Sequence, residues 1–168
     1  MNAAAALESK AGRVAILAAR VGVAAVFLFA AFPKLQDPEA FARDIDNYHV
    51  LPDAGVGPMA IAMPIAEVLV ALALLLGVHA RGAALVTAGM LLTFIAAMAQ
   101  ALARGIDLDC GCFGSAAPTQ VSGLTIARNV FLLALTLLVM LGPDVDWRRP
   151  FGGPPPDESS DPAPPQAA

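Results

Sequence analysis

The residues best suited to chemistry are two cysteines that lie almost together in the chain. Cys110 and Cys112 are the only cysteines, and a single glycine, Gly111, separates them. A disulfide between them would close a very small ring and should be strained, and strained or exposed disulfides are the oxidising, labile and catalytic ones. Gly111 suits this turn because a Cβ there would restrict the backbone angles that closing the ring requires. The pattern predicts a redox-active dithiol.

Three other uses of the cysteine pair remain open. A structural disulfide over so short a separation would remove almost no entropy from the unfolded chain and would stabilise the fold little. A structural zinc site needs about four ligands, and no second pair of cysteines or histidines has suitable spacing, so we expect no metal. Lipidation of a cysteine next to a membrane span is also conceivable, although it usually occurs on the cytoplasmic side.

The neighbouring charges distinguish the two thiols. Asp107 and Asp109 precede Cys110, and nearby negative charge disfavours a thiolate. Cys112 is therefore the expected attacking thiol. Because the chain has no second cysteine pair, electrons cannot be relayed internally, and they must leave to a bound quinone or to another protein. The candidate residues of this turn are Asp109, Cys110, Gly111, Cys112, Phe113 and Gly114.

The elements that must position this turn are membrane helices. Hydrophobic residues make up 58% of the chain and charged residues 14%, against roughly 45–50% and 25% in an average soluble protein, and the mean hydropathy is +0.69. A helix needs roughly 20 mostly apolar residues to cross a bilayer, and only helices satisfy their backbone groups within a chain segment in lipid. Four segments qualify: Val14–Phe32, Pro58–Val78, Gly82–Ala103 and Val121–Gly142. The predicted fold class is all-α, an integral membrane four-helix bundle.

Lysine and arginine counts near the span ends predict the orientation. With a cytoplasmic N-terminus, five basic residues lie inside and three outside: Lys10, Arg13, Arg81, Arg148 and Arg149 against Lys34, Arg43 and Arg104. Both termini are then cytoplasmic in a multi-pass protein of the plasma or inner membrane, and the loops 33–57 and 104–120 face outside. The expected organisation is a cytoplasmic N-terminus over 1–13, a membrane domain over 14–142 and a Pro-rich disordered tail over 143–168. A net charge of −4 offers no basic surface for nucleic acid.

Ionisable residues inside the spans form a second group of candidates. Glu67 and Arg128 lie at similar depth in parallel spans, so they could pair inside the bundle, and Arg20 could reach Glu67 from the cytoplasmic side. These charges either fix helix packing or move protons or bind a quinone head group below the cysteine turn. Gln100, one helical turn before Arg104, could hydrogen-bond a ligand carbonyl or a neighbouring helix.

Several of these segments together resemble a known family, the MauE/DoxX-like membrane proteins, and within it the methylamine-utilisation MauE branch. The resemblance runs from about Arg20 to Arg128 and rests mainly on Asp109-Cys110-Gly111-Cys112-Phe113-Gly114. Weaker similarities are Phe-Pro-Lys34-Leu35-Gln-Asp37-Pro38, Asn47-Tyr48-His-Val-Leu51-Pro52 and Pro64-Ile-Ala-Glu67. The turn before Lys34 lacks the glycine expected in the family, and the long tail lies outside its pattern.

The resemblance implies a four-helix membrane bundle with a thiol–disulfide role and quinone-linked electron transfer. The substrate it implies is an extracytoplasmic thiol or disulfide protein such as periplasmic methylamine dehydrogenase, whose maturation the MauE branch is associated with. If the protein is an enzyme, it is a thiol–disulfide oxidoreductase. Two other classes remain: a non-catalytic membrane assembly subunit whose cysteine turn only shapes a loop, and a small transporter, suggested by Glu67, Arg128 and Pro64 within the spans.

Overall fold

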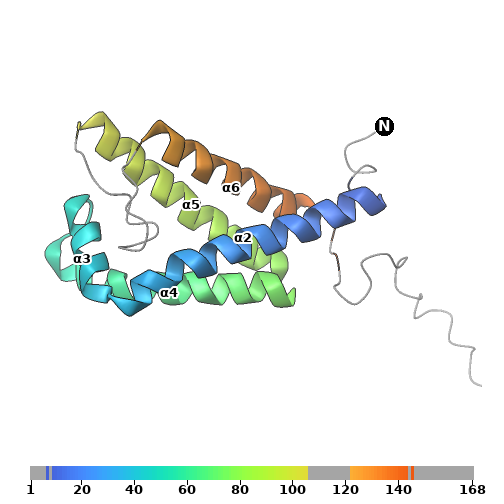
Figure 1. Ribbon diagram of the computed structural model, residues 1–168, viewed down its shortest axis with the longest axis horizontal. Helices are drawn as coiled ribbons and strands as arrows, with labels where there is room; N and C mark the ends of the chain where they lie inside the picture. The colour runs from blue at the N-terminus through green and yellow to red at the C-terminus, as the bar shows by residue number, and fades with distance from the viewer. Residues whose placement is uncertain (1–6, 8, 106–121, 144, 146–168) are drawn as a thin grey trace, which may run out of the picture.

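A computed structural model describes residue 7 and residues 9–105, 122–143 and 145 of the chain. The described residues form helices and contain no strand. Four helices are long: α2 (Lys10–Gln36), α4 (Asp53–Leu76), α5 (Ala80–Ala103) and α6 (Gly123–Leu141). A short helix, α3 (Pro38–Asn47), joins α2 to α4 and lies at one end of the bundle (Figure 1).

The helix ends follow from residues that satisfy or interrupt the backbone hydrogen bonds. The side chain of Ser9 accepts a hydrogen bond from the backbone N–H of Gly12 at the start of α2, at 3.1 Å. Ser122 caps α6 in the same way, as hydroxyl side chains commonly do at helix starts. The helix α4 ends at Leu76 and is followed by Gly77, whose left-handed φ of 75° is readily adopted by glycine.

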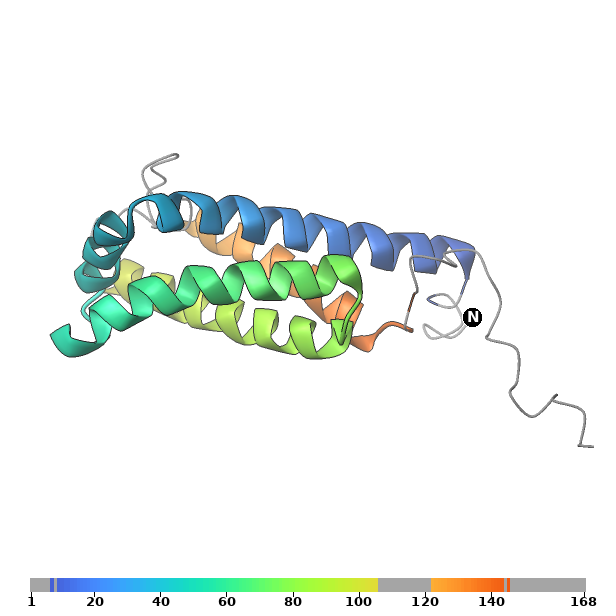
Figure 2. The same cartoon turned by 90° about the horizontal axis from the view of Figure 1, so that it is seen from below.

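The long helices form a four-membered ring in which each helix packs on two neighbours. The helix α2 packs on α4 and α6, and α5 packs on the same two helices from the other side. Figure 2 shows α2 running along one edge with α4 and α5 beneath it. Consecutive long helices run in opposite directions, so the start of α4, the end of α5 and the start of α6 all lie at the end of the bundle where α3 sits (Figures 1 and 2).

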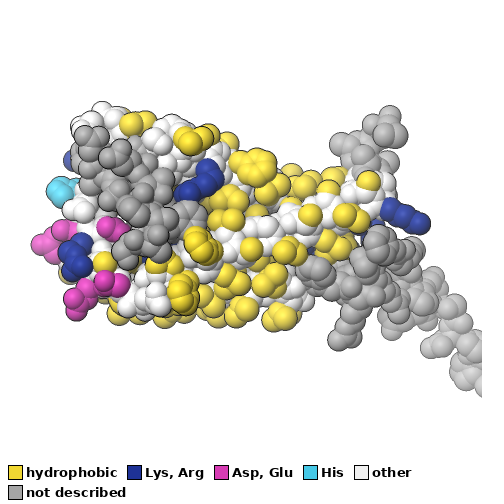
Figure 3. All heavy atoms as spheres, in the orientation of Figure 1, with side chains coloured by type: hydrophobic (Ala, Val, Ile, Leu, Met, Phe, Trp, Pro, Cys, Tyr) yellow, Lys and Arg dark blue, Asp and Glu magenta, His cyan; other side chains and the backbone are white. Residues whose placement is uncertain are grey.

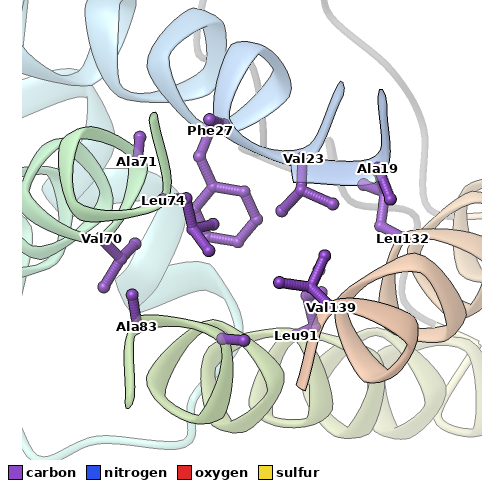
Figure 4. Packing of buried hydrophobic residues seen from close by; sticks show 12 residues of the cluster. Ala19, Val23, Phe27, Val70, Ala71, Leu74, Ala83, Leu91, Leu132 and Val139 are labelled. Carbon is purple, nitrogen blue, oxygen red and sulfur yellow. The ribbon is translucent and has the colours of Figure 1, made fainter. Parts of the chain in front are cut away.

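The centre of the ring is filled by apolar side chains from all four long helices. Figure 4 shows Phe27 of α2, Leu74 of α4, Leu91 of α5 and Val139 of α6 converging there. Small residues lie between them: Ala24, Ala71 and Ala84 are fully buried. Small side chains let helix backbones approach closely, which is the usual way that membrane helices pack.

The outside of the ring is also apolar. Phe29, Phe32, Leu69, Leu85 and Phe131 are each more than 60% exposed, and hydrophobic side chains cover the flank of the bundle in Figure 3. The acidic and histidine side chains visible in this view lie at the α3 end, whereas lysine and arginine side chains are also visible on the flank and at the opposite end. The four long helices are each long and apolar enough to cross a membrane. The predicted fold class, an all-α membrane helical bundle, is confirmed.

The segment 33–57 differs most from its prediction as an outer loop. The helix α2 continues through Pro33 to Gln36, and α4 already begins at Asp53. Between them, Asp37 Oδ1 accepts a hydrogen bond from the backbone N–H of Ala40 at 2.8 Å, and Pro38 occupies the first turn of α3. Both residues favour a helix start. The sequence prediction missed α3 because the polar residues between Pro38 and Asn47 were interpreted as part of a loop.

The domain limits 1–13, 14–142 and 143–168 stay predictions. Nearly all of the 143–168 tail lies outside the described residues, so its predicted disorder is not tested. In the N-terminal segment, α2 begins at Lys10, four residues before the predicted start of the first span. The helix boundaries elsewhere differ from the predicted spans by a few residues, as helix ends commonly do.

Candidate functional site

The cysteine turn itself lies outside the described residues, together with its candidate residues Asp109, Cys110, Gly111, Cys112, Phe113 and Gly114. The positions where its segment begins and ends are described. Gly105 follows the last turn of α5, and Ser122 caps the start of α6. Both helix ends lie at the α3 end of the bundle (Figures 1 and 2). Since Cys110 follows Gly105 by five residues, it is tethered within about 18 Å of that point.

A buried ion pair lies below this end of the bundle. Lys34 Nζ of α2 donates to Glu67 Oε1 of α4 at 2.5 Å, and the two side chains are 2% and 1% exposed. The predicted pairing of Glu67 with Arg128 is therefore wrong, because the carboxylate takes a lysine from the neighbouring helix. The prediction missed Lys34 because it ended the first span at Phe32 and placed the lysine in a loop.

The helical periodicity of α2 contained the signal that identifies Lys34. Buried positions recur every three or four residues along the helix: Ile16, Arg20, Val23, Phe27, Ala31 and Lys34. Such spacing marks one face of a helix. Extending the helix one turn past Pro33 places Lys34 on the buried face, where an amine requires a partner.

The surroundings of the ion pair are a mixture of aromatic and polar groups. The Lys34 ammonium lies 5.0 Å from the centre of the Phe41 ring and 5.6 Å from that of Phe94, distances that suit cation–π attraction. Glu67 Oε2 is buried and accepts no hydrogen bond within the described part of the chain. It lines a small cavity of about 30 Å³ with Lys34 and Arg128. Glu67 and Arg128 thus share a cavity, as their similar depth suggested, without forming the predicted pair.

Arg20 has a different role from the predicted one. Its guanidinium donates to the backbone carbonyl of Leu74 through Nε at 3.1 Å and Nη2 at 2.8 Å, and to that of Val145 through Nη1 at 2.8 Å. Leu74 lies in the last turn of α4, whose carbonyls have no partner within the helix. The expectation that Arg20 reaches Glu67 is wrong. Arg20 instead joins α2 to the end of α4 and to the chain beyond α6.

A larger cavity of about 360 Å³ lies beside the ion pair, toward the α3 end. Helices α2, α3, α4 and α5 all contribute to its wall. Its polar side chains are Lys34, Asp44, Tyr48, Thr93 and Gln100. Of this group only Gln100 was a candidate from the sequence; Thr93 lies on the same helix, and Lys34, Asp44 and Tyr48 lie on the extension of α2 or on and next to α3.

Tyr48 supplies the cavity with a hydroxyl that stays protonated. Burial of the phenol, and secondly the carboxylate of Asp44, raise the pKa of Tyr48 to about 12. At neutral pH the hydroxyl is therefore able to donate a hydrogen bond. His49, the next residue, is exposed, and its Nδ1 lies 2.6 Å from the backbone oxygen of Asp46.

The described residues offer no metal site of the usual kind, since they contain no group of three or more His, Cys, Asp or Glu side chains able to hold an ion. The chemistry available to them is that of a mostly apolar cavity with a few polar groups, next to a buried lysine–glutamate pair. Such a cavity suits an apolar ligand that accepts hydrogen bonds.

Comparison with known proteins connects this arrangement to one family. The family model described as Methylamine utilisation protein MauE matches residues 12–142. The chain is 38% identical to a methylamine utilization protein MauE of Paracoccus denitrificans over 126 residues, which is 74% of this chain and 68% of that protein. A protein of the same name from Paracoccus versutus is 37% identical over 71% of this chain and 65% of its own length.

A third relative, the methylamine utilization protein MauE of Methylorubrum extorquens, is 36% identical over 73% of this chain and 67% of its own length. No solved structure matches the chain. These comparisons confirm the MauE part of the resemblance, and the wider DoxX-like part stays a resemblance only. With four apolar helices and a family match over most of its length, the chain is a multi-pass membrane protein that belongs to the MauE family of methylamine utilisation proteins.

Proposed function

We propose that the protein is a membrane thiol–disulfide oxidoreductase that uses Cys110 and Cys112 on the extracytoplasmic side. Its partner is an extracytoplasmic protein that gains or exchanges disulfides during maturation. Membership of the methylamine utilisation family makes an enzyme of methylamine metabolism, such as methylamine dehydrogenase, the proposed partner. The cell or inner membrane is the proposed location, with both termini in the cytoplasm.

One observation carries the proposal. The only two cysteines of the chain stand one residue apart, on the segment that joins the ends of α5 and α6 at the α3 end of the bundle. Acidic side chains gather at this end in Figure 3, which is the expected composition of a bundle end in water. A segment that starts and ends at this end of the bundle supports a disulfide turn that a soluble partner could reach.

The exchange chemistry needs only the two thiols and a partner cysteine pair. The thiolate of Cys112 attacks a disulfide of the partner, which forms a mixed disulfide and releases one partner thiolate. Cys110 then attacks the Cys112 sulfur and releases the second partner thiolate, leaving the pair oxidised and the partner reduced. In the opposite direction the partner's two thiols become a disulfide and Cys110 and Cys112 become thiols. Every step exchanges one sulfur–sulfur bond for another.

The proposed orientation rests on the distribution of basic residues. Lys10 and Arg13 lie in the first turns of α2, and Arg81 lies in the first turn of α5, at the end of the bundle away from α3. Arg43 and Arg104 lie at the α3 end, where Asp37, Glu39, Asp46 and Asp53 accompany them. Basic residues retained at the cytoplasmic ends therefore direct the cysteine segment outside.

A membrane-impermeant maleimide of high mass tests both the location and the redox activity. In intact cells treated with a mild reductant, the protein should gain the mass of two labels, and without reductant it should gain fewer. In a variant that lacks both cysteines, Val78→Cys supplies the matched control. Val78 is exposed in the turn between α4 and α5, and a cysteine there should be labelled only after lysis.

Three results would count against the proposal. Labelling of Cys110 and Cys112 only after lysis would reverse the orientation. Labelling that never responds to reductant or oxidant would leave the non-catalytic assembly subunit as the better account. If Val78→Cys is labelled in intact cells while Cys110 and Cys112 of the wild-type protein are not, the bundle has the opposite orientation in the membrane.

A further inference from the structure

The cavity of about 360 Å³ exists because one pair of neighbouring elements is held apart. The helix α3 packs on α4 and α2, and in the described chain no part of it approaches the backbone of α5. The cavity is lined by Phe41 of α3 and its C-cap Tyr48, and by Phe94 and Met98 of α5. Its volume lies within the range of about 300–1,000 Å³ found for small-molecule sites.

The cavity wall is suited to a flat, mostly apolar molecule. Three aromatic rings and three thioethers line it: Phe41, Tyr48, Phe94, Met59, Met63 and Met98. Methionine side chains adapt to irregular ligands and contact aromatic rings favourably. Thr93 and Ala96 are exposed side chains of α5 that also line the cavity. Because α5 is one of the apolar, membrane-length helices, a ligand dissolved in the bilayer would meet the cavity wall at these two residues.

Lys34 gives the cavity a hydrogen-bond donor at its inner wall. An ammonium group carries three N–H donors, and Glu67 Oε1 accepts one of them. The Gln100 amide, which also lines the cavity, is a further donor. These groups match carbonyl oxygens on the ligand.

The charge balance excludes an anionic head group. The positive charge of Lys34 is compensated by the paired Glu67, and the cavity wall contains the carboxylate side chain of Asp44. A phosphate would gain no net attraction there and would lose its hydration. A neutral ligand with carbonyl acceptors is the chemistry that the site favours.

We propose that this cavity binds the head group of a lipid-soluble quinone, which accepts the electrons of the protein. This inference rests on the proposed thiol–disulfide function. A chain with one cysteine pair must pass two electrons to an outside acceptor after each oxidation. Two S–H bonds break and one S–S bond forms, and the two electrons and two protons convert the two quinone carbonyls into the hydroxyls of a quinol. The step needs no other reactant.

Photolabelling with a short-chain azidoquinone tests the site on the full-length protein in nanodiscs of phosphatidylcholine and phosphatidylglycerol. Labelled peptides should map to the cavity walls in α3, α4 and α5, and decylubiquinone should compete. Ala97 lines the cavity and Ala99 is an exposed residue of the same helix outside it. Ala97→Phe should reduce labelling about tenfold, the effect of losing ~1.4 kcal/mol of binding, and Ala99→Phe should leave it unchanged.

Gln100→Leu gives a second test that does not disturb the bundle, because Gln100 is exposed. Loss of one hydrogen bond should weaken labelling about two- to tenfold. Labelling spread evenly over the lipid-facing side chains, or competition by phospholipid as effective as by decylubiquinone, would overturn the quinone site and assign the cavity to lipid. Labelling of the Ala97→Phe variant at the wild-type level would also overturn the quinone site.

The test separates this inference from the proposed function. A protein with both cysteines replaced by serine should still be labelled, since none of the described cavity residues is a cysteine. Labelling of the wild-type protein with cysteines that never change state would refute the redox function and leave the binding site standing. If the cysteines change between thiol and disulfide but the protein is not labelled by the azidoquinone, only the quinone site is refuted.

Discussion

Cys110→Ser and Cys112→Ser should each abolish the ability of the protein to support growth on methylamine in a strain that lacks it. A dithiol completes an oxidation cycle only when both sulfurs are present, because each mixed disulfide needs a second thiol for its resolution. Both variants should insert at wild-type levels, since neither position falls within the four membrane-length helices of the described chain. Growth rate and membrane protein level measured together check the prediction.

The two cysteine variants should differ in what they accumulate. Cys110→Ser retains Cys112, the expected attacking thiol, and should accumulate a reductant-sensitive adduct of higher mass with its partner protein on non-reducing gels. An adduct confined to Cys112→Ser would exchange the roles of the two thiols. Unimpaired growth with either single variant would eliminate the dithiol mechanism and favour an assembly subunit.

Breaking the buried ion pair should produce the largest loss of stability in the described part of the chain. Lys34→Met leaves the Glu67 carboxylate without its partner, and Glu67→Gln leaves the ammonium without its own. Each change should cost about 3–5 kcal/mol, the usual penalty for an uncompensated buried charge. The double variant removes both charges and should recover to within about 1 kcal/mol of the wild type. Unfolding in mixed detergent micelles measures all three.

Arg128 supplies the matched control for this cycle. Arg128 lines the same small cavity as Glu67 but is not the residue that holds its carboxylate. Combining Glu67→Gln with Arg128→Met should therefore restore no stability. Additive losses for Lys34 and Glu67, together with rescue of Glu67→Gln by Arg128→Met, would show that the carboxylate is paired as the sequence first suggested.

Sequence patterns were sufficient to predict the membrane fold and were insufficient to predict its polar contacts. Four long apolar spans are enough to predict the bundle, because in lipid only a helix satisfies the backbone hydrogen-bonding groups of such a segment. The partner of Glu67 depends on rotation about the helix axes and on where α2 ends. One extra turn beyond Pro33 carries Lys34 into the bundle, and a composition-based span limit cannot detect that turn.

The cavity was unpredictable for a related reason. Its wall combines α3, a helix recognisable only by its Asp37 cap, Pro38 and the buried Phe41 and Ile45, with a face of α5 whose neighbours depend on packing. Gln100 was a candidate because it is a polar residue in an apolar span, which is a local property. Lys34 and Tyr48 line the cavity because α2 extends past Pro33 and α3 packs against α2 and α4 at the end of the bundle.

The central claim is that Cys110 and Cys112 form a catalytic rather than a structural disulfide. Equilibration of the purified full-length protein with glutathione buffers of known potential, followed by alkylation and mass spectrometry, measures it most directly. The account predicts a two-electron transition between about −120 and −270 mV, the range of disulfide-exchanging proteins. A pair that stays oxidised below about −300 mV, as structural disulfides do, or one that never forms a disulfide, would contradict it.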